Sequence, residues 1–136
     1  MLRAATALIA SMAAASAIAA PASAPAGPSA CAASPRRVGA CFVVHGRLAV
    51  WNGAPAVRIW RIGTKRMLGV VGADGDPASA HLTPPSVDRA RTTDFTAVDG
   101  DYRVCPLSIA RPGHMQIVCM DGAANLVARE PRALKP

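Results

Sequence analysis

The clearest pattern in the chain is an alternation of apolar and polar residues that begins at Cys41. Over residues 41–51 every second position is apolar or glycine, and His45 and Arg47 lie between such positions. A period of two residues is typical of a β-strand that buries one face. The Asn52-Gly53 pair that follows is a strong hairpin signal. We therefore expect a strand over 41–51 that turns back immediately.

A second strand is expected over residues 56–62. If Asn52-Gly53 forms a two-residue turn, Leu48 faces Val57 across the hairpin. A four-residue loop that ends at Pro55 preserves the same parity of inward and outward side chains. The hairpin is therefore predicted, and its register stays open between these two forms.

A third strand follows the Gly63-Thr64 turn and places Leu68 opposite Ile59. The three strands then share one apolar face, as a half-buried antiparallel sheet requires. Beyond them, residues 72–91 are rich in glycine and proline and have no clear period. We expect this segment to be a long loop that crosses between two sheets, and its length makes it a candidate functional loop.

The last part of the domain is again typical of hairpins. Asp99-Gly100-Asp101, Arg111-Pro112-Gly113 and Asp121-Gly122 are common turn sequences. Four strands are expected around them, over residues 93–98, 102–109, 114–120 and 125–129. The total of about seven short strands predicts an all-β fold, an antiparallel β-sandwich of the prealbumin or immunoglobulin type.

The N-terminus has the pattern of a secretory signal. Arg3 precedes an uncharged, alanine-rich apolar run, and small residues follow where a signal peptidase cuts. We expect residues 1–19 to be a signal peptide cleaved after Ala19, with cleavage after Ala24 as the alternative. The apolar run is too short for a membrane span. These features predict an exported protein, either periplasmic or secreted.

Three further divisions follow from composition. Residues 20–37 are rich in Pro, Ala, Ser and Gly and are expected to form a poorly ordered linker. Residues 38–129 form the predicted sandwich domain, and residues 130–136 form a loose tail. A lipid-modified Cys31 is an alternative interpretation of the N-terminal region, although the residues before it lack the expected Leu or Val.

Four cysteines in a small exported chain favour two disulfides. The predicted hairpin places Cys105 directly opposite Cys119, within bridging distance. Cys31 and Cys41 are then expected to pair with each other. The chain has no Cys-x-x-Cys motif, and its three histidines have no ligand spacing. We therefore expect no metal site, no redox site and no cofactor.

The chain is basic, with 15 Lys and Arg against 8 Asp and Glu and a formal net charge of +7. Such a charge favours anionic partners. Like charges do not form a long block and the aromatic fraction is only 4%, so no specific nucleic-acid surface is expected. The predicted partner is a protein, a glycan or another anionic ligand of the cell envelope, and we expect a monomer.

Turn and strand motifs follow one another in a set order between Val43 and Met120. They are Gly46-Arg47-Leu48, Asn52 to Ile59, Gly63-Thr64, Thr93-Asp94 and Asp99 to Val104. This order resembles that of the transthyretin-like domains, which are also known as carboxypeptidase-regulatory-like or prealbumin-like sandwiches. The resemblance implies a β-sandwich that serves as a binding or scaffolding module. The chain also resembles small uncharacterised exported bacterial proteins.

Four side chains on the polar face of the first sheet form a candidate ligand patch. They are His45, Arg47, Arg58 and Trp60. In the two-residue register His45 faces Trp60, and Arg47 faces Arg58. The arginines could hold a carboxylate, sulfate or phosphate, and the tryptophan could stack on a ligand. Alternatively, the two arginines simply cover the tryptophan ring.

The sequence contains no recognisable catalytic constellation. The Asp-Gly-Asp segments do not continue into a calcium loop, and no nucleophile motif or phosphate loop is present. The basic cluster over residues 61–66 is expected to be a solvated hairpin tip. We therefore expect a non-enzymatic binding or accessory module of the envelope with a basic surface. The alternative is a structural or inhibitor-like protein that acts through residues 72–91.

Overall fold

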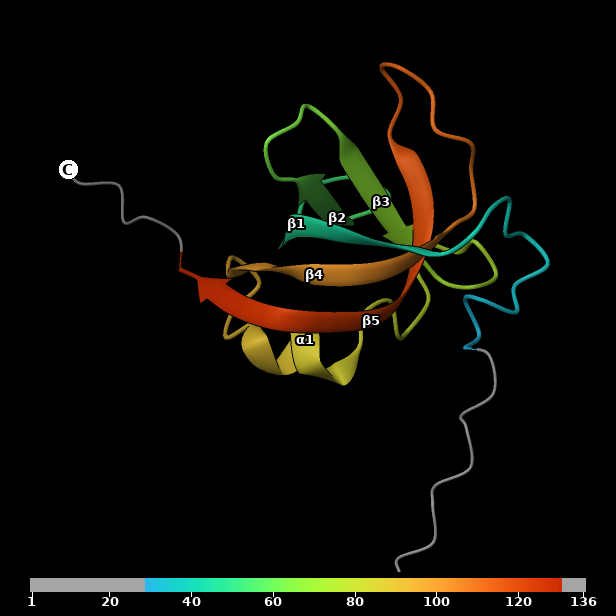
Figure 1. Ribbon diagram of the computed structural model, residues 1–136. Helices are drawn as coiled ribbons and strands as arrows, with labels where there is room; N and C mark the ends of the chain where they lie inside the picture. The colour runs from blue at the N-terminus through green and yellow to red at the C-terminus, as the bar shows by residue number, and fades with distance from the viewer. Residues whose placement is uncertain (1–28, 131–136) are drawn as a thin grey trace, which may run out of the picture.

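A computed structural model describes residues 29–130, and the five strands in this range form one closed barrel (Figure 1). The strands are β1 (Phe42–Val50), β2 (Val57–Arg61), β3 (Met67–Val71), β4 (Ala97–Pro106) and β5 (Gln116–Arg129). A short helix, α1 (Pro85–Ala90), lies between β3 and β4. The expected signal peptide, the first part of the linker and nearly all of the tail lie outside the described residues.

The barrel has the strand order β1-β2-β3-β5-β4, and β4 pairs with β1 to close it. All neighbouring strands are antiparallel except β3 and β5, which are parallel. This is the arrangement of the five-stranded Greek-key barrel that is called the OB fold. The fold is therefore all-β as expected, but the two-sheet sandwich prediction is wrong.

The sandwich prediction failed because two turn-like sequences lie inside continuous strands. Asp99-Gly100-Asp101 is in the middle of β4, and Asp121-Gly122 is in the middle of β5. Pairing between the two strands is irregular at both places, which is how bulges allow a strand to bend without ending. Four expected short strands thus become two long bent strands, and the long strands close the barrel.

Gly100 explains why its segment continues as a strand. An added Cβ there would lie 2.6 Å from Leu126 and 3.1 Å from the Ala124 carbonyl oxygen, so glycine lets β5 and the barrel interior approach closely. The carboxylates on either side project from the outer face and meet basic partners on β1. The turn signal is overridden by tertiary packing and by ion pairing.

The first three strands follow the sequence prediction closely. Leu68 lies opposite Ile59, as expected. In the first hairpin, however, Leu48 pairs with Ile59 and Val50 with Val57. Because the Trp51 amide also donates to the Ala56 carbonyl at 2.8 Å, the loop between them has four residues. The four-residue alternative is therefore confirmed, and the parity of the apolar face is preserved.

The barrel interior is filled by aliphatic side chains and by the single tyrosine of the chain. The fully buried residues include Leu48, Ile59, Leu68, Val70, Val98, Tyr102, Val104 and Val118. The Tyr102 hydroxyl donates to the Val98 carbonyl at 2.5 Å. Burial, with a contribution from the charge of Asp99, raises the pKa of Tyr102 above its usual range.

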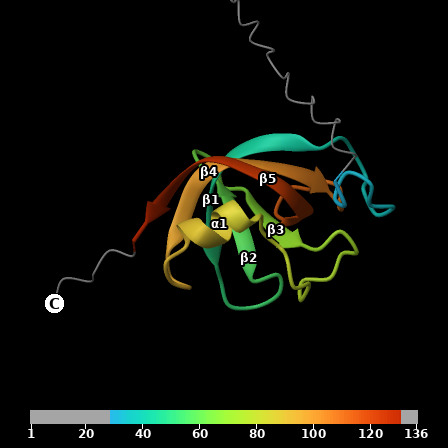
Figure 2. The same ribbon diagram turned by 90° about the horizontal axis from the view of Figure 1, so that it is seen from below.

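Residues 72–91 are not a free crossing loop. They include α1, which lies across one side of the barrel and buries Val87 in the core (Figures 1 and 2). Asp74 anchors the start of the segment, because its carboxylate accepts hydrogen bonds from the Asp76 amide at 3.0 Å and the Ser79 hydroxyl at 3.2 Å. The helix was not anticipated because six residues are too few to produce a helical period.

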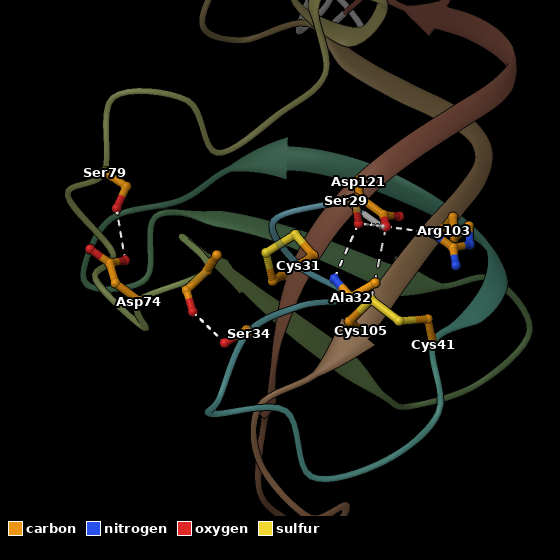
Figure 3. Close-up of a disulfide and its surroundings, with 12 residues drawn as sticks. Ser29, Cys31, Ala32, Ser34, Cys41, Asp74, Ser79, Arg103, Cys105 and Asp121 are labelled. Carbon is orange, nitrogen blue, oxygen red and sulfur yellow. Dashed lines mark hydrogen bonds and ion pairs between the residues drawn. A yellow bond between two sulfur atoms is a disulfide. The ribbon is translucent and has the colours of Figure 1, made fainter. Parts of the chain in front are cut away.

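The disulfides join the N-terminal segment, residues 29–41, to β4 and β5 (Figure 3). All four cysteines are bonded, but the pairs are Cys31–Cys119 and Cys41–Cys105. The expected pairs are therefore wrong, although Cys105 does lie opposite Cys119 in the sheet. The outer face of these strands at the two cysteines is covered by the N-terminal segment.

This segment packs on the barrel where a poorly ordered linker was expected. Cys31 and Ser34 are buried, and the Ser34 hydroxyl donates to the Ala73 carbonyl at 2.6 Å. Ser29 and Arg103 both donate to the Asp121 carboxylate, which is 5% exposed (Figure 3). The bulge at Asp121 turns this side chain toward the N-terminal segment. The Asp121-Gly122 sequence therefore helps to hold that segment on the barrel and does not form a turn.

Candidate functional site

Two residues of the predicted patch, Arg47 on β1 and Trp60 on β2, belong to a row of charged and aromatic side chains that crosses four strands. Trp60 pairs with Arg47 across β1 and β2, and the Arg47 guanidinium carbon lies 5.7 Å from the centre of the tryptophan ring. On its other side Arg47 donates two hydrogen bonds to Asp99 of β4, at 2.6 and 3.0 Å. Arg129 of β5 donates to the same carboxylate at 2.9 Å.

Asp99 lies between the two arginines of this row, so that one carboxylate engages two guanidinium groups. Its side chain is only 10% exposed, and the hydrogen bond from Arg47 is the largest of the effects that lower its pKa. The same bond raises the pKa of Arg47. A bidentate guanidinium–carboxylate pair of this geometry is already satisfied. Arg47 therefore stabilises the barrel wall and is poorly placed to bind an external anion.

The remaining two predicted residues have partners of their own. The Nδ1 atom of His45 lies 2.8 Å from an Asp101 oxygen, and Asn125 donates to the other oxygen at 2.7 Å. The Asn125 hydrogen bond, followed by that of His45, lowers the pKa of Asp101. Arg58 donates to the Pro55 carbonyl at 2.9 Å and so holds the first hairpin loop.

The structure thus brings together only two of the four predicted patch residues, Arg47 and Trp60. The expected opposition of His45 to Trp60 and of Arg47 to Arg58 is wrong, because the four-residue loop shifts the register by two residues. The alternative, in which an arginine covers the tryptophan ring, describes Arg47 correctly. Asp99 and Asp101, which pair with the basic side chains of this face, belong to a sequence that resembles a turn.

A second basic region lies between the β2–β3 turn and the loop that joins β4 to β5. The two project from the same side of the barrel, away from α1 (Figure 1). Between them is a groove of about 510 Å³. We call it the basic groove, and its lining residues are Lys65, Arg66, Met67, Arg111, Pro112, Gly113, His114 and Met115.

Local hydrogen bonds give the β2–β3 turn a defined shape. The Thr64 hydroxyl donates to the Arg61 carbonyl at 2.8 Å and accepts from the Arg66 amide at 3.0 Å. The Trp60 indole donates to the Thr64 carbonyl at 2.7 Å. Trp60 therefore supports the wall of the basic groove, a role that differs from the stacking role predicted for it.

The opposite wall of the basic groove is also built by specific contacts. The Ile117 amide donates to the Ser108 hydroxyl at 2.8 Å, which closes the base of the β4–β5 loop. Pro55 and Met115 both pack over Gly69 of β3, where an added Cβ would lie 2.5 Å from the proline ring and 3.2 Å from the methionine sulfur. Glycine at that point lets the first hairpin loop and the β4–β5 loop rest directly on the sheet.

The electrostatics of the basic groove differ from those of the row around Asp99. Lys65, Arg66 and Arg111 are exposed, and within residues 29–130 none of them forms an ion pair with a carboxylate. Its volume lies in the range typical of ligand sites. Cationic side chains that converge on a hollow without internal counter-charges attract an anionic ligand.

The donor set of the basic groove does not favour a metal. Met67, Met115 and His114 supply thioether and imidazole groups, which are ligands for soft metal ions. The neighbouring Lys65, Arg66 and Arg111 would repel a cation. Among the described residues, no cluster of three or more His, Cys, Asp or Glu side chains has the proximity needed to hold a metal ion.

A separate hollow, of about 370 Å³, lies beside α1 and has a mixed charge. Its lining is Asp88, Arg91, Thr92, Thr93 and Asp94. Asp94 pairs with Arg91 at 3.4 Å, and Asp88 accepts from the Thr83 hydroxyl at 2.5 Å. Two carboxylates face one guanidinium in this lining, so the hollow offers less attraction to an anionic ligand than the basic groove does.

Sequence reasoning assigned Lys65 and Arg66 to a solvated tip and did not connect them with Arg111 and His114. A signal for the connection does exist. All eight acidic residues lie outside residues 57–73 and 102–120, the two stretches that form the walls of the basic groove. The distance between these stretches in the sequence, together with the unforeseen parallel pairing of β3 with β5, concealed their proximity.

Comparison with known proteins adds no functional assignment. No family model, no curated protein and no solved structure matches the chain. These comparisons do not test the resemblance to the transthyretin-like domains, but the β-sandwich that it implied is replaced by the closed barrel. Within residues 29–130, none of the helical structure has the length and apolar character of a membrane span.

Proposed function

We propose that this protein is an exported, non-enzymatic binding module of the cell envelope and that it holds an anionic ligand in the basic groove. One observation carries the proposal. Lys65, Arg66 and Arg111 converge on a hollow from two separate hairpins, and none of them pairs with a carboxylate among the described residues. In the charged row across β1, by contrast, both arginines are already engaged by Asp99.

Export is supported by two independent features. The N-terminal sequence has the charge and the small residues of a cleavable signal. Two disulfides join the N-terminal segment to the barrel, and such bonds are typical of oxidising compartments. A periplasmic or secreted location follows as part of the proposal.

A binding role rather than catalysis is supported by what the carboxylates do. Asp99 and Asp101, the two outward-facing acids of β4, are engaged by Arg47 and His45 and do not line the basic groove. General acid–base catalysis needs a titratable group within reach of the substrate. The lining of the basic groove includes two titratable side chains of that kind, His114 and Lys65, and no carboxylate.

The alternative of an inhibitor-like protein that acts through residues 72–91 has less support. This segment contributes Val87 to the core and is tied to the N-terminal segment through Ala73. A loop with these structural contacts has little freedom to insert into a partner.

The test of the proposed function compares two variants with equal net charge. Lys65→Ala/Arg66→Ala removes two cations from the basic groove, and Arg36→Ala/Arg37→Ala removes two adjacent cations from the N-terminal segment. Retention on a heparin column is measured for both variants and the wild type. We expect the first variant to elute at clearly lower salt than the second, because bulk charge is the same in both.

If both variants lost the same amount of heparin retention, heparin binding would be a property of net charge alone. That result would overturn the proposal. Circular dichroism of each variant confirms that the barrel is intact, and both substitutions are at exposed positions. Arg111→Ala, on the opposite wall, should reproduce the loss if the ligand spans the groove.

A further inference from the structure

The β4–β5 loop carries an exposed apolar side chain among the cations of the basic groove. Ile109 is 67% exposed and lies two residues before Arg111. A second hollow, of about 390 Å³, shares Arg111, His114 and Met115 with the basic groove and extends it to Ile109 and Ile117. The cationic surface therefore continues directly into an apolar one.

Both elements that carry this surface are hairpin tips on one side of the molecule. The β2–β3 turn and the β4–β5 loop project together, while α1 covers the opposite side (Figure 1). Because they project beyond the barrel wall, the two tips can reach a flat surface at the same time. A flat anionic surface would meet Lys65, Arg66 and Arg111 together with Ile109.

The distribution of charge around the two tips favours an external anionic surface, because these stretches of the chain contain no carboxylate. The acidic residues lie outside residues 57–73 and 102–120, so both tips present cations without carboxylates. A soluble polyanion would use the cations but would leave Ile109 in water. A lipid surface accepts both groups, because basic side chains meet the headgroups while an apolar side chain enters the acyl boundary.

We propose that the basic groove and Ile109 together form a docking surface for anionic lipid headgroups at a membrane surface. This inference rests on the proposed function and names the ligand of the same site. Each basic side chain near an anionic membrane strengthens binding about fivefold. Three cations and one inserted isoleucine are therefore sufficient for reversible association, and Ile109 adds a contribution that salt does not screen.

The experiment is flotation of the purified protein with vesicles of phosphatidylcholine and phosphatidylglycerol in equal parts, against vesicles of phosphatidylcholine alone. Binding is expected only to the anionic vesicles. Lys65→Ala/Arg66→Ala should weaken this binding about 25-fold, which is two fivefold steps. Ile109→Ser should weaken it about tenfold, because apolar surface no longer leaves water.

The matched control for the apolar contact is Val43→Ser. Val43 is 64% exposed, nearly the same as Ile109, but it lies on the outer face of β1 and lines neither hollow. It should leave vesicle binding unchanged. Heparin retention separates the two proposals, since Ile109→Ser should bind heparin as the wild type does.

Two results would overturn the lipid assignment and leave the proposed function standing. One is groove-dependent heparin binding without binding to anionic vesicles, which would make the ligand a soluble polyanion. The other is equal vesicle binding by Ile109→Ser and Val43→Ser. If heparin retention did not depend on the groove residues, the proposed function itself would be overturned, and the lipid assignment with it.

Discussion

Cys105 and Cys119 face each other across β4 and β5, yet each is bonded to a different cysteine of the N-terminal segment. The two disulfides join residues that are 88 and 64 positions apart. A bond between Cys105 and Cys119 would instead have closed only a short hairpin. Cross-links over longer loops remove more conformational entropy from the unfolded chain. The two bonds therefore do what a hairpin bond could not, because they hold a separate segment on the barrel.

Disulfide mapping tests this arrangement directly. Trypsin alone leaves Cys105 and Cys119 in one peptide, because the bond between Arg111 and Pro112 resists cleavage. Additional cyanogen bromide cleavage at Met115 separates them. Mass spectrometry without reduction is expected to find one peptide pair that contains Cys31 and Cys119.

The second expected pair in this digest joins Cys41 to Cys105. A linked Cys105–Cys119 pair would contradict the structure and would restore the simple hairpin interpretation. Reduction should release four separate cysteine peptides, which provides the internal control.

Asp99→Asn tests the charged row across the barrel wall. We expect a loss of about 1–2 kcal/mol in the free energy of unfolding at pH 7, since hydrogen bonds between charged groups are lost but Arg47 and Arg129 are partly exposed. Urea denaturation measures the loss. A difference indistinguishable from zero would show that the row contributes nothing to stability.

The pH dependence of the wild type follows from the lowered pKa of Asp99. The stabilisation is complete above the pKa of the unfolded chain, about 3.9. It is lost as the pH falls from there through the lower pKa of the folded state, because the unfolded carboxylate takes up its proton first. The difference between wild type and Asp99→Asn should therefore shrink in this acidic window and stay constant near neutrality.

Tyr102 provides a spectroscopic prediction, since it is the only tyrosine of the chain. Burial raises its pKa above the usual value, so the folded protein should show no phenolate absorbance near pH 10. Stability is fully present below the pKa of the unfolded phenol and decreases as the pH rises above it. Phenolate absorbance and loss of circular dichroism are expected in one step, and a separate ionisation of the folded protein would contradict the burial of Tyr102.

Gly46→Ala tests the close contact between β1 and β2. An added Cβ would clash with the Ile59 side chain and lie 2.8 Å from the Trp60 carbonyl oxygen. We expect a loss of about 3 kcal/mol or more in the free energy of unfolding, because the carbonyl belongs to a rigid strand. Thermal and urea denaturation measure the loss.

Gly63→Ala is the matched control for that substitution. Gly63 has a φ of +81°, but nothing lies within 4 Å of an added Cβ. Only the cost of the left-handed conformation remains, about 1–2 kcal/mol. If both variants lost the same stability, the close approach of β1 and β2 would not be the reason for a glycine at position 46.

The candidate site was predictable in part. The positions of Arg47 and Trp60 on one outer face follow from the alternation along β1 and β2. The neutralisation of Arg47 by Asp99 was not predictable, since 52 residues separate the two and Asp99-Gly100-Asp101 has the composition of a turn. The basic groove was missed for the same reason, because its two walls meet only after β5 has paired with β3.

The sequence by itself determined the local elements: the alternating strands of the first three-stranded unit, the pairing of Ile59 with Leu68, and the opposition of Cys105 to Cys119. Each of these depends on side-chain parity and on a nearby turn, which act over a few residues. Only the tertiary structure decided the closed barrel, the disulfide partners and the basic groove. These depend on contacts between distant segments, where a bulged strand can continue through a turn sequence because packing and ion pairs outweigh the local preference.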